Sequence, residues 1–410
     1  MRRFVSCLAL LLLPALAADA QVRTYHLPIG DPARRDRTVP VVLDGIVDTR
    51  TGDVLTPDEV AARLAATRLL LAGESHTSIE FHRAQLRIIR ALHEAGRHVM
   101  IGLEMFPSTE QASLDQWHDG LLTEAGFVRL ARWYEHWGYH WRYYRDIFLY
   151  ARDQGIRMYA VNSPRDVVAA VRMKGLANLT PEQAAHVPAD IDVDSDDHMT
   201  FFKASFEEGD MIHGGLSEQA WRGMLSAQAT WDASMGYNAV QALKRDGNER
   251  SIMVVLVGSG HVAYGVGIER QARRWLDGGI ATMIPVPIVG SDDTPIAEVQ
   301  ASYADFVWGV PGEPATLFPT LGISTRALDD GRRQVIQVSR ESVAAAAGFA
   351  LNDVLVSMDG RSVRDRETLN DLMAAKQWGD SATFVVTRDG VEQTLTAVFR
   401  RPPPKPRSPH

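Results

Sequence analysis

Short apolar segments alternate with longer amphipathic segments between about residue 68 and residue 289. Continuous apolarity, in contrast to strict alternation, is typical of strands that are buried on both faces of a sheet. Five segments of this kind are bounded by glycine, proline or charged residues and are expected to be strands: Leu69–Ala72, Val99–Met105, Ile156–Val161, Ile252–Val257 and Ala281–Ile288.

The amphipathic segments are expected to be helices. Apolar side chains recur every three or four residues from Phe81 to Ala95, opposite a row of charged residues, and the pattern returns from about Ser217 to Arg245. This spacing places the apolar side chains on one face of a helix. Alternating strands and helices predict an α/β domain with a mainly parallel sheet flanked by helices.

The composition changes near Gly290, where turn-forming and polar residues replace the strand and helix pattern. Residues 21–290 are therefore expected to form the first domain, residues 291–315 a linker and residues 316–400 a smaller second domain. The proline-rich tail at 401–410 is predicted to be disordered, because it has too few apolar residues to bury a core.

The N-terminus resembles a secretory signal peptide. Arg2 and Arg3 precede an apolar stretch from Phe4 to about Leu16, and Ala20 ends a small-x-small cleavage pattern. We expect cleavage after Ala20 and a periplasmic or secreted protein without a transmembrane segment after that cleavage. Cys7 lies inside the apolar stretch and is the only cysteine, so no lipobox and no disulfide are expected.

Charge excludes one class of partner. The 410 residues carry a formal net charge of −8, and no basic segment suggests binding to nucleic acid or to an anionic membrane surface. A small-molecule ligand remains compatible with this charge, because a local pocket can differ from the whole surface.

Two histidines follow predicted strands in the same local pattern. Gly73-Glu74-Ser75-His76 follows the first apolar run, and Gly258-Ser-Gly-His261 follows the fourth. Glycine permits a sharp turn at the end of a strand, and ligands bind beyond the carboxyl ends of parallel strands. The repetition indicates one shared site, although either histidine alone is more typical of an ordinary turn.

A carboxylate lies between the two motifs. Glu104 is near the end of an apolar predicted strand, so it must be paired, hydrogen-bonded or protonated. An ion pair with Arg83 or Arg165 is the plain interpretation. The alternative is a site in which His76, Glu104 and His261, with Glu74, hold a divalent metal ion.

Three further stretches are ambiguous. His82 begins the helix after His76 and either faces the same crevice or packs against its own helix, and Arg165 opens a helix where it either binds an anionic group or is solvated. The acidic stretch Asp190–His198 is interpreted as a solvated loop. The tryptophans and histidines of residues 133–141 are interpreted as aromatic packing, and the alternative is a binding site for a flat ligand.

The ordered motifs resemble the ChaN-type haem-binding proteins of the Tiki/erythromycin-esterase superfamily over about residues 45–290. The motifs are Gly-Glu-x-His (73–76), His-x-x-Gln (82–85), Gly-Leu-Glu-Met-Phe (102–106), Ala-Val-Asn-x-Pro-Arg (160–165) and Gly-Ser-Gly-His-Val (258–262). The superfamily pattern of two G-x-x-H motifs with a glutamate between them corresponds here to His76, Glu104 and His261.

The resemblance implies two kinds of function. ChaN-like members bind haem through a tyrosine in a dimeric pocket, which implies haem as cofactor, iron uptake and a homodimer. No motif assigns that tyrosine here, and Tyr264 is proposed beside His76, His82, Arg165 and His261 as cofactor-binding. Other relatives are esterases or metal-dependent peptidases, which implies catalytic roles for Glu74, His76, Glu104 and His261.

The second domain resembles a PDZ domain of the bacterial periplasmic type. Leu321-Gly322-Ile323 matches the carboxylate-binding loop, Ala347-Gly-Phe349 and Asn352–Gly360 match the most recognisable stretch, and Glu367–Gln377 corresponds to the helix beside the groove. Such a domain docks a protein C-terminus or peptide as an added strand. The sequence thus favours an exported haem- or iron-binding protein with a docking domain, with a periplasmic hydrolase as the alternative.

Overall fold

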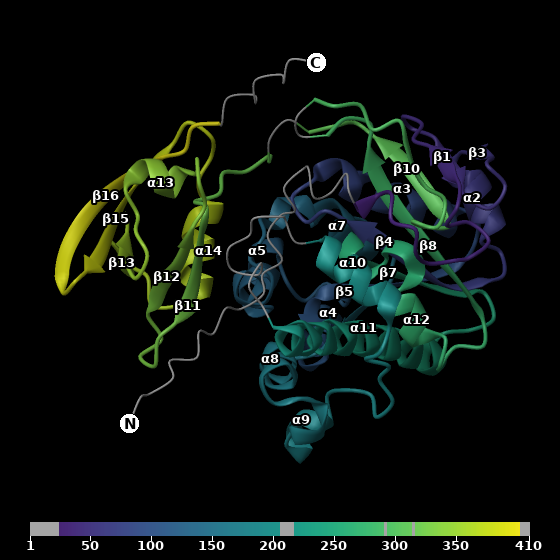
Figure 1. The fold of residues 1–410 in the computed structure, drawn as a ribbon, viewed down its shortest axis with the longest axis horizontal. Coiled ribbons are helices and arrows are strands. Elements are labelled where there is room, and N and C mark those ends of the chain that lie inside the picture. The colour runs from purple at the N-terminus through teal and green to yellow at the C-terminus, as the bar shows by residue number, and fades with distance from the viewer. Residues whose placement is uncertain (1–23, 206–216, 291–292, 314–315, 402–410) are drawn as a thin grey trace. The chain divides into compact units, whose positions relative to one another are not determined.

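The computed structural model describes residues 24–205, 217–290, 293–313 and 316–401 (Figure 1). The predicted signal peptide and nearly all of the predicted disordered tail lie outside these residues. The described residues divide into two compact units, one with residues 24–127, 142–205, 217–290 and 293–313 and the other with residues 128–141 and 316–401. Among the described residues, no helix combines the length and apolarity required to cross a membrane.

An eight-stranded, mainly parallel sheet organises the first unit, with strand order β3-β2-β10-β8-β4-β7-β5-β6. Five consecutive pairings, from β10 to β6, are parallel, whereas β2 pairs antiparallel with both β3 and β10. The strands are β2 (Ile46–Asp48), β3 (Val54–Leu55), β4 (Thr67–Glu74), β5 (His98–Pro107), β6 (Met158–Asn162), β7 (Ser251–Gly258), β8 (Gly279–Pro287) and β10 (Phe306–Val310). The five predicted strands are confirmed as β4 to β8.

Helices connect and cover these strands (Figure 1). The two predicted helices are confirmed as α3 and the long α11. The helices described over residues 24–290 are α2 (Pro57–Arg63), α3 (Ile79–Glu94), α4 (Gln111–His118), α5 (Glu124–Leu130), α6 (Trp133–His136), α7 (Arg145–Asp153), α8 (Arg165–Lys174), α9 (Pro181–Ala184), α10 (Asp196–Ala204), α11 (Glu218–Asp246) and α12 (Ile268–Ala272). Of these, α6 belongs to the second compact unit.

Burial on both sides of the sheet explains the continuous apolar runs. Leu69, Leu70 and Leu71 of β4 are all fully buried. Leu69 and Leu71 belong to a core cluster that includes Met235 and Ala239 of α11. Successive strand residues point to opposite faces, so Leu70 faces the other layer, where α3 packs against β4 and β5. The expected α/β architecture is therefore confirmed.

The boundary of the first domain differs from the prediction. Residues interpreted as a linker contain β9 (Glu298–Gln300), which pairs with β1 (Thr38–Pro40), and β10, which pairs with β8 in the main sheet. Among the described residues, the first compact unit accordingly extends to Glu313 and does not end at Gly290. The proline and glycine residues around these strands are loop residues between short strands, and the apolar run Phe306–Val310 is a buried strand.

The second unit contains an antiparallel sheet with the order β11-β12-β13-β15-β16, and β14 pairs with β13. Its buried apolar cluster lies entirely between Leu321 and Phe399, so these residues supply their own core. Its elements are β11 (Ile323–Ala327), β12 (Arg333–Val338), α13 (Val343–Ala347), β13 (Val354–Met358), β14 (Arg361–Ser362), α14 (Arg366–Ala374), β15 (Ser381–Arg388) and β16 (Val391–Val398). The expected small, mostly-β second domain is confirmed.

Candidate functional site

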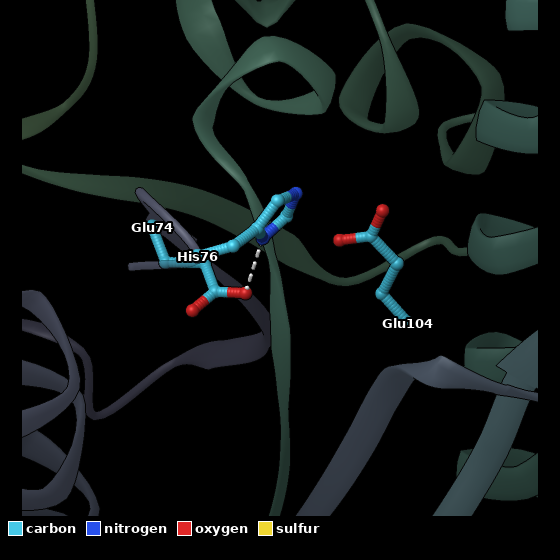
Figure 2. Close-up of side chains that lie close together, drawn as sticks. All are labelled: Glu74, His76 and Glu104. Carbon is cyan, nitrogen blue, oxygen red and sulfur yellow. Dashed lines mark hydrogen bonds and ion pairs between the residues drawn. The ribbon is translucent and has the colours of Figure 1, made fainter. Parts of the chain in front are cut away.

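Three parallel strands bring the predicted site residues to one edge of the sheet. Glu74 is the last residue of β4 and is in register with Gly258, the last residue of β7, while Glu104 lies near the end of β5. His76 follows β4 directly, and Figure 2 shows its ring between the carboxylates of Glu74 and Glu104. The two G-x-x-H motifs therefore contribute to one site.

Glu74 organises the first half of this cluster. Its carboxylate lies 2.9 Å from His76 Nδ1 and 2.9 Å from His82 Nδ1. The Tyr144 hydroxyl donates to Glu74 Oε1 at 2.9 Å, and the Tyr144 ring lies 4.2 Å from that of His82. His82 is 2% exposed. It therefore belongs to the buried support of Glu74 and does not face a ligand.

Glu104 and His261 form the second half. The backbone N–H of Gly258 donates to Glu104 Oε2 at 2.7 Å, and His261 Nε2 lies 3.4 Å from Glu104 Oε1. The sequence had suggested an ion pair between Glu104 and Arg83 or Arg165. The structure instead pairs Glu104 with His261 and the Gly258 amide. Arg83 pairs with Glu80, and Arg165 is the first residue of α8.

Helix α11 supplies a partner that the sequence analysis missed. His261 Nδ1 lies 2.6 Å from Asp232 Oδ1, and the other Asp232 oxygen lies 3.6 Å from His198 Nε2. Gln228, one helical turn before Asp232, also places its amide nitrogen 2.9 Å from His261 Nδ1. The available signal was that Gln228 and Asp232 are two polar residues one turn apart beside the apolar row of the predicted helix.

The acidic stretch before α10 is not simply a solvated loop. His198 is 1% exposed and reaches Asp232, whereas Asp192 pairs with Arg270 and Arg274. These contacts attach the stretch to α12 and its C-terminal end. The prediction of a solvated loop is therefore wrong for its histidine, because partners distant in sequence determine its burial.

Opposite charges set the ionisation of the cluster. Burial raises the pKa of Glu74, but His82 and His76 outweigh burial and hold it at about 2. Burial likewise opposes ionisation of Glu104, yet His261 and His76 lower its pKa overall. Burial lowers the pKa of His261, but Asp232 and Glu104 raise it to about 10. The cluster thus favours ionised carboxylates at Glu74 and Glu104 and a protonated His261.

Acid should weaken the fold through Glu74. Its pKa is lower in the folded chain, at about 2, than the ordinary value of 4.5, so its contribution is complete above pH 4.5 and lost as pH falls towards 2. This shift corresponds to on the order of 3 kcal/mol. Urea unfolding between pH 7 and pH 3 should show a shallower pH dependence in Glu74→Gln than in the wild type. Parallel curves would contradict the assignment.

One member of the cluster is accessible. The side chain of His76 is 21% exposed, against 0% for Glu74, 8% for Glu104 and 4% for His261. Gly258 gives the His76 ring room, because a Cβ there would lie 3.0 Å from His76 Cε1 and would make the ring shift, while Glu104 Oε2 would lie at an ordinary contact distance of 3.7 Å. A ligand that reaches the cluster from solvent therefore meets His76 first.

The same side chains could hold a metal ion. Single ligand atoms of Glu74, His76 and Glu104 all lie within 4.8 Å of one another. Carboxylate oxygen and imidazole nitrogen suit divalent first-row metals. Of the four residues predicted to hold a metal ion, these three form the group, whereas the fourth, His261, lies with its Nε2 3.4 Å from Glu104 Oε1.

Tyr264 does not fit the role of haem ligand. Its side chain is buried, and its hydroxyl donates to the Thr24 carbonyl at 2.6 Å and accepts from the Leu27 amide at 2.9 Å. Burial raises the pKa of Tyr264, which disfavours the phenolate that would bind ferric iron. The structure thus corrects this assignment: Tyr264 attaches the N-terminal segment to the core.

The predicted carboxylate-binding loop lies at the start of β11. Leu321 is buried, and Gly322 has a φ of +80°, a conformation that side chains rarely adopt. A Cβ on Gly322 would also lie 2.3 Å from the Ser342 Cβ. Strand β11 is at one end of the strand order and is therefore an edge strand of the described sheet, the kind of strand to which a peptide can add.

Comparisons with known proteins agree with this architecture. The profile of the family described as haem-binding uptake, Tiki superfamily, ChaN matches residues 60–271, and a PDZ-domain profile matches residues 319–398. A solved structure described as cofacial haem binding to ChaN of Campylobacter jejuni covers 65% of this chain and 98% of its own, with a TM-score of 0.51. Its identity is 16%, so it supports the fold.

Two curated proteins share parts of the chain. Protein RETICULATA-RELATED 5, chloroplastic, of Arabidopsis thaliana is 29% identical over 192 residues, which is 44% of this chain and 25% of that protein. A Mesorhizobium japonicum protein whose name describes a zinc metalloprotease is 43% identical over 65 residues, or 15% of this chain and 17% of that protein. The chain thus spans a quarter or less of each relative. Because the haem-binding profile matches more than half of the chain, the protein belongs to the ChaN-type haem-binding uptake family of the Tiki superfamily and carries a PDZ domain after it.

Proposed function

We propose that this protein is exported to the periplasm, where its first domain binds haem for uptake or handling and its PDZ domain docks a peptide or protein partner. The observation that supports haem binding most directly is that His76 is partly exposed, whereas the charged residues around it are buried. This cluster lies in a domain that belongs to a haem-binding family. Imidazole is an established ligand of haem iron. The N-terminal sequence supports export, and the Campylobacter ChaN structure supports haem as the ligand class.

The cluster also suits the chemistry of iron. Glu74 accepts a hydrogen bond from His76 Nδ1, which orients the ring and increases the electron density at Nε2. Tyr144 and His82 in turn hold Glu74. His76 is therefore the residue of the cluster to which we assign the iron contact. The dimeric pocket of the resembling proteins extends the proposal to a homodimer, which light scattering with and without haem would detect.

Haem titration of the full chain tests this assignment. The wild type should show a shift of the Soret band that saturates at a defined haem ratio, and His76→Ala should bind at least about tenfold more weakly. His98→Ala is the matched control, because His98 lies at the opposite end of β5 and contacts Ser251. It should titrate like the wild type. Equal binding by His76→Ala and the control would place haem elsewhere, and no Soret shift in any protein would reject haem binding.

A second candidate function is metal-dependent hydrolysis. The observation in its favour is the group of ligand atoms from Glu74, His76 and Glu104 within 4.8 Å. A divalent ion held there would lower the pKa of a bound water, and Glu104 or Glu74 would accept its proton. His261, held by Asp232, would stabilise the charged carboxylate of Glu104.

Mass spectrometry of metal content separates the two candidates. The hydrolase candidate predicts one equivalent of a divalent metal in the purified full chain, a loss of that metal in Glu104→Gln, and ester or peptide hydrolysis that follows the metal. A metal-free, inactive protein that binds haem would reject it. His98→Ala serves again as the control for handling losses.

A further inference from the structure

Residues 128–141 lie within the stretch that matches the haem-binding family, yet they form one compact unit with the PDZ residues. The helix within this segment, α6, packs against the PDZ helix α14. The sequence analysis interpreted its tryptophans and histidines as aromatic packing. The structure confirms packing, as in the edge-to-face contact between Trp133 and Trp141, and identifies α14 as a partner of the segment.

One stripe of α14 makes the polar contacts. Asn370 Nδ2 donates to the Tyr134 carbonyl at 2.9 Å, and Arg366 donates to the carbonyls of Glu135 at 3.3 Å and Trp137 at 3.2 Å. Residues 366 and 370 are four apart and therefore lie on the same face of the helix. The segment thus satisfies its carbonyl groups with PDZ side chains, which distinguishes it from a passive loop.

Gly138 shows how closely the segment approaches α14. Its φ is +86°, and a Cβ there would lie 2.6 Å from a guanidinium nitrogen of Arg366 and 3.0 Å from Asn370 Nδ2. Any other residue would therefore be strained and would also displace the two side chains that hold the segment. The backbone at Gly138 therefore packs directly against the Arg366 and Asn370 side chains of α14.

The segment also contacts the approach to the peptide site. His140 stacks on Phe318 with ring centroids 3.5 Å apart and an interplanar angle of 6°, and its Nε2 donates to the Ala374 carbonyl at 3.0 Å. Phe318 directly precedes the PDZ match and lies three residues before Leu321 of the carboxylate-binding loop. Residues 134–140 therefore contact both the helix and the chain that leads into the loop.

The chain then continues directly into the buried cluster. Only residues 142 and 143 separate Trp141 from Tyr144, whose hydroxyl donates to Glu74 Oε1 at 2.9 Å. Tyr144 is fully buried, so its position depends on the backbone on either side of it. A movement of residues 134–141 thus has only two intervening residues through which to reach Tyr144, whose hydroxyl holds Glu74.

We propose that residues 128–144 link the PDZ domain to the buried cluster. Arg366 and Asn370 of α14 hold residues 134–140, and Tyr144 holds Glu74. A peptide that binds in the PDZ groove therefore alters both the position of residues 134–140 and the hydrogen bond from Tyr144 to Glu74. The peptide would add to β11 beside α14 and compete with the segment for the helix. Such coupling is reciprocal, so occupation of the cluster changes the affinity of the groove by the same factor. The inference does not depend on whether the cluster binds haem or a metal ion.

Hydrogen–deuterium exchange of the full chain tests the link without any ligand. Asn370→Ala removes the bond to Tyr134, so exchange should rise about fivefold in residues 133–141 and, through the link, in residues 74–78. Tyr144→Phe should raise exchange in residues 74–78 and also in 133–141. The buried strand β7 serves as the internal control and should not change, which shows that the variants are folded.

The matched control is Arg361→Ala, because Arg361 is an exposed residue of β14 in the same unit, and its ion-pair partner, Asp371, is 3.9 Å away. It should leave both regions unchanged. If exchange in Asn370→Ala rises in residues 133–141 but is unchanged in residues 74–78, the proposed link is wrong. No rise anywhere in Asn370→Ala would overturn the contact with α14 itself.

Discussion

Asp232→Ala is expected to lower the free energy of unfolding by about 3–5 kcal/mol, which is the typical cost of removing one partner from a buried ion pair. Asp232 is fully buried on α11 and lies 2.6 Å from His261 Nδ1. Its carboxylate raises the pKa of His261 together with Glu104, against the effect of burial. Without it, a buried imidazole loses its principal anion, and urea unfolding at pH 7 should show the loss.

The matched control for this prediction is Asp246→Ala. Asp246 is the last residue of the same helix, its side chain is 28% exposed, and it pairs with Arg245 at 2.8 Å and also interacts with the Tyr159 side chain. Partly exposed interactions of this kind contribute about 1 kcal/mol or less each. Asp232→Asn should fall between the two, because it keeps the shape but not the charge. Similar losses in Asp232→Ala and Asp246→Ala would contradict the buried charge network.

Gly258→Ala is expected to weaken ligand binding at the cluster about 10- to 100-fold, the range found when residues that orient ligating groups are changed. The added Cβ would lie 3.0 Å from His76 Cε1, closer than nearly all real Cβ contacts, so His76 must move. Glu104 Oε2, at 3.7 Å, and the amide that donates to it limit the direction of that movement. Haem titration and metal content of the purified full chain both report the effect.

Gly260→Ala provides the control within the same motif. A Cβ on Gly260 would meet no atom within 4 Å, and the residue is two positions from Gly258. The two variants therefore differ in the space available at the added methyl group and not in chemistry or sequence context. Equal binding by Gly258→Ala and Gly260→Ala would show that the cluster around His76 is not the ligand site.

Local pattern was sufficient to predict the central strands. Each of β4 to β8 is a continuous apolar run, because a strand between two layers of helix has no solvent face. The same reasoning missed β10, although Phe306–Val310 is equally apolar, since the surrounding prolines and glycines suggested a linker. The pairing of β10 with β8 joins segments separated by a loop, and pattern alone does not establish it.

The candidate site was predictable only in part, for a similar reason. The repeated G-x-x-H motif brought His76 and His261 together because both follow parallel strands, and Glu104 joined them near the end of a third. Asp232 comes from α11 and Tyr144 from the turn before α7, both distant in sequence from the residues they contact, and their contacts arise from packing. For Tyr264 the sequence led to a wrong assignment. Tyr264 is close to His261 in sequence, but its hydroxyl is bonded to the Thr24 carbonyl and is not accessible to a ligand.

Anomalous diffraction at the iron edge, from crystals of the full chain soaked with haem, tests the central claim most directly. The account predicts an iron peak within bonding distance of His76, at the carboxyl edge of the sheet and beside Glu74 and Glu104. An iron peak on residues outside this edge, with the His76–Glu74 hydrogen bond unchanged, would contradict it.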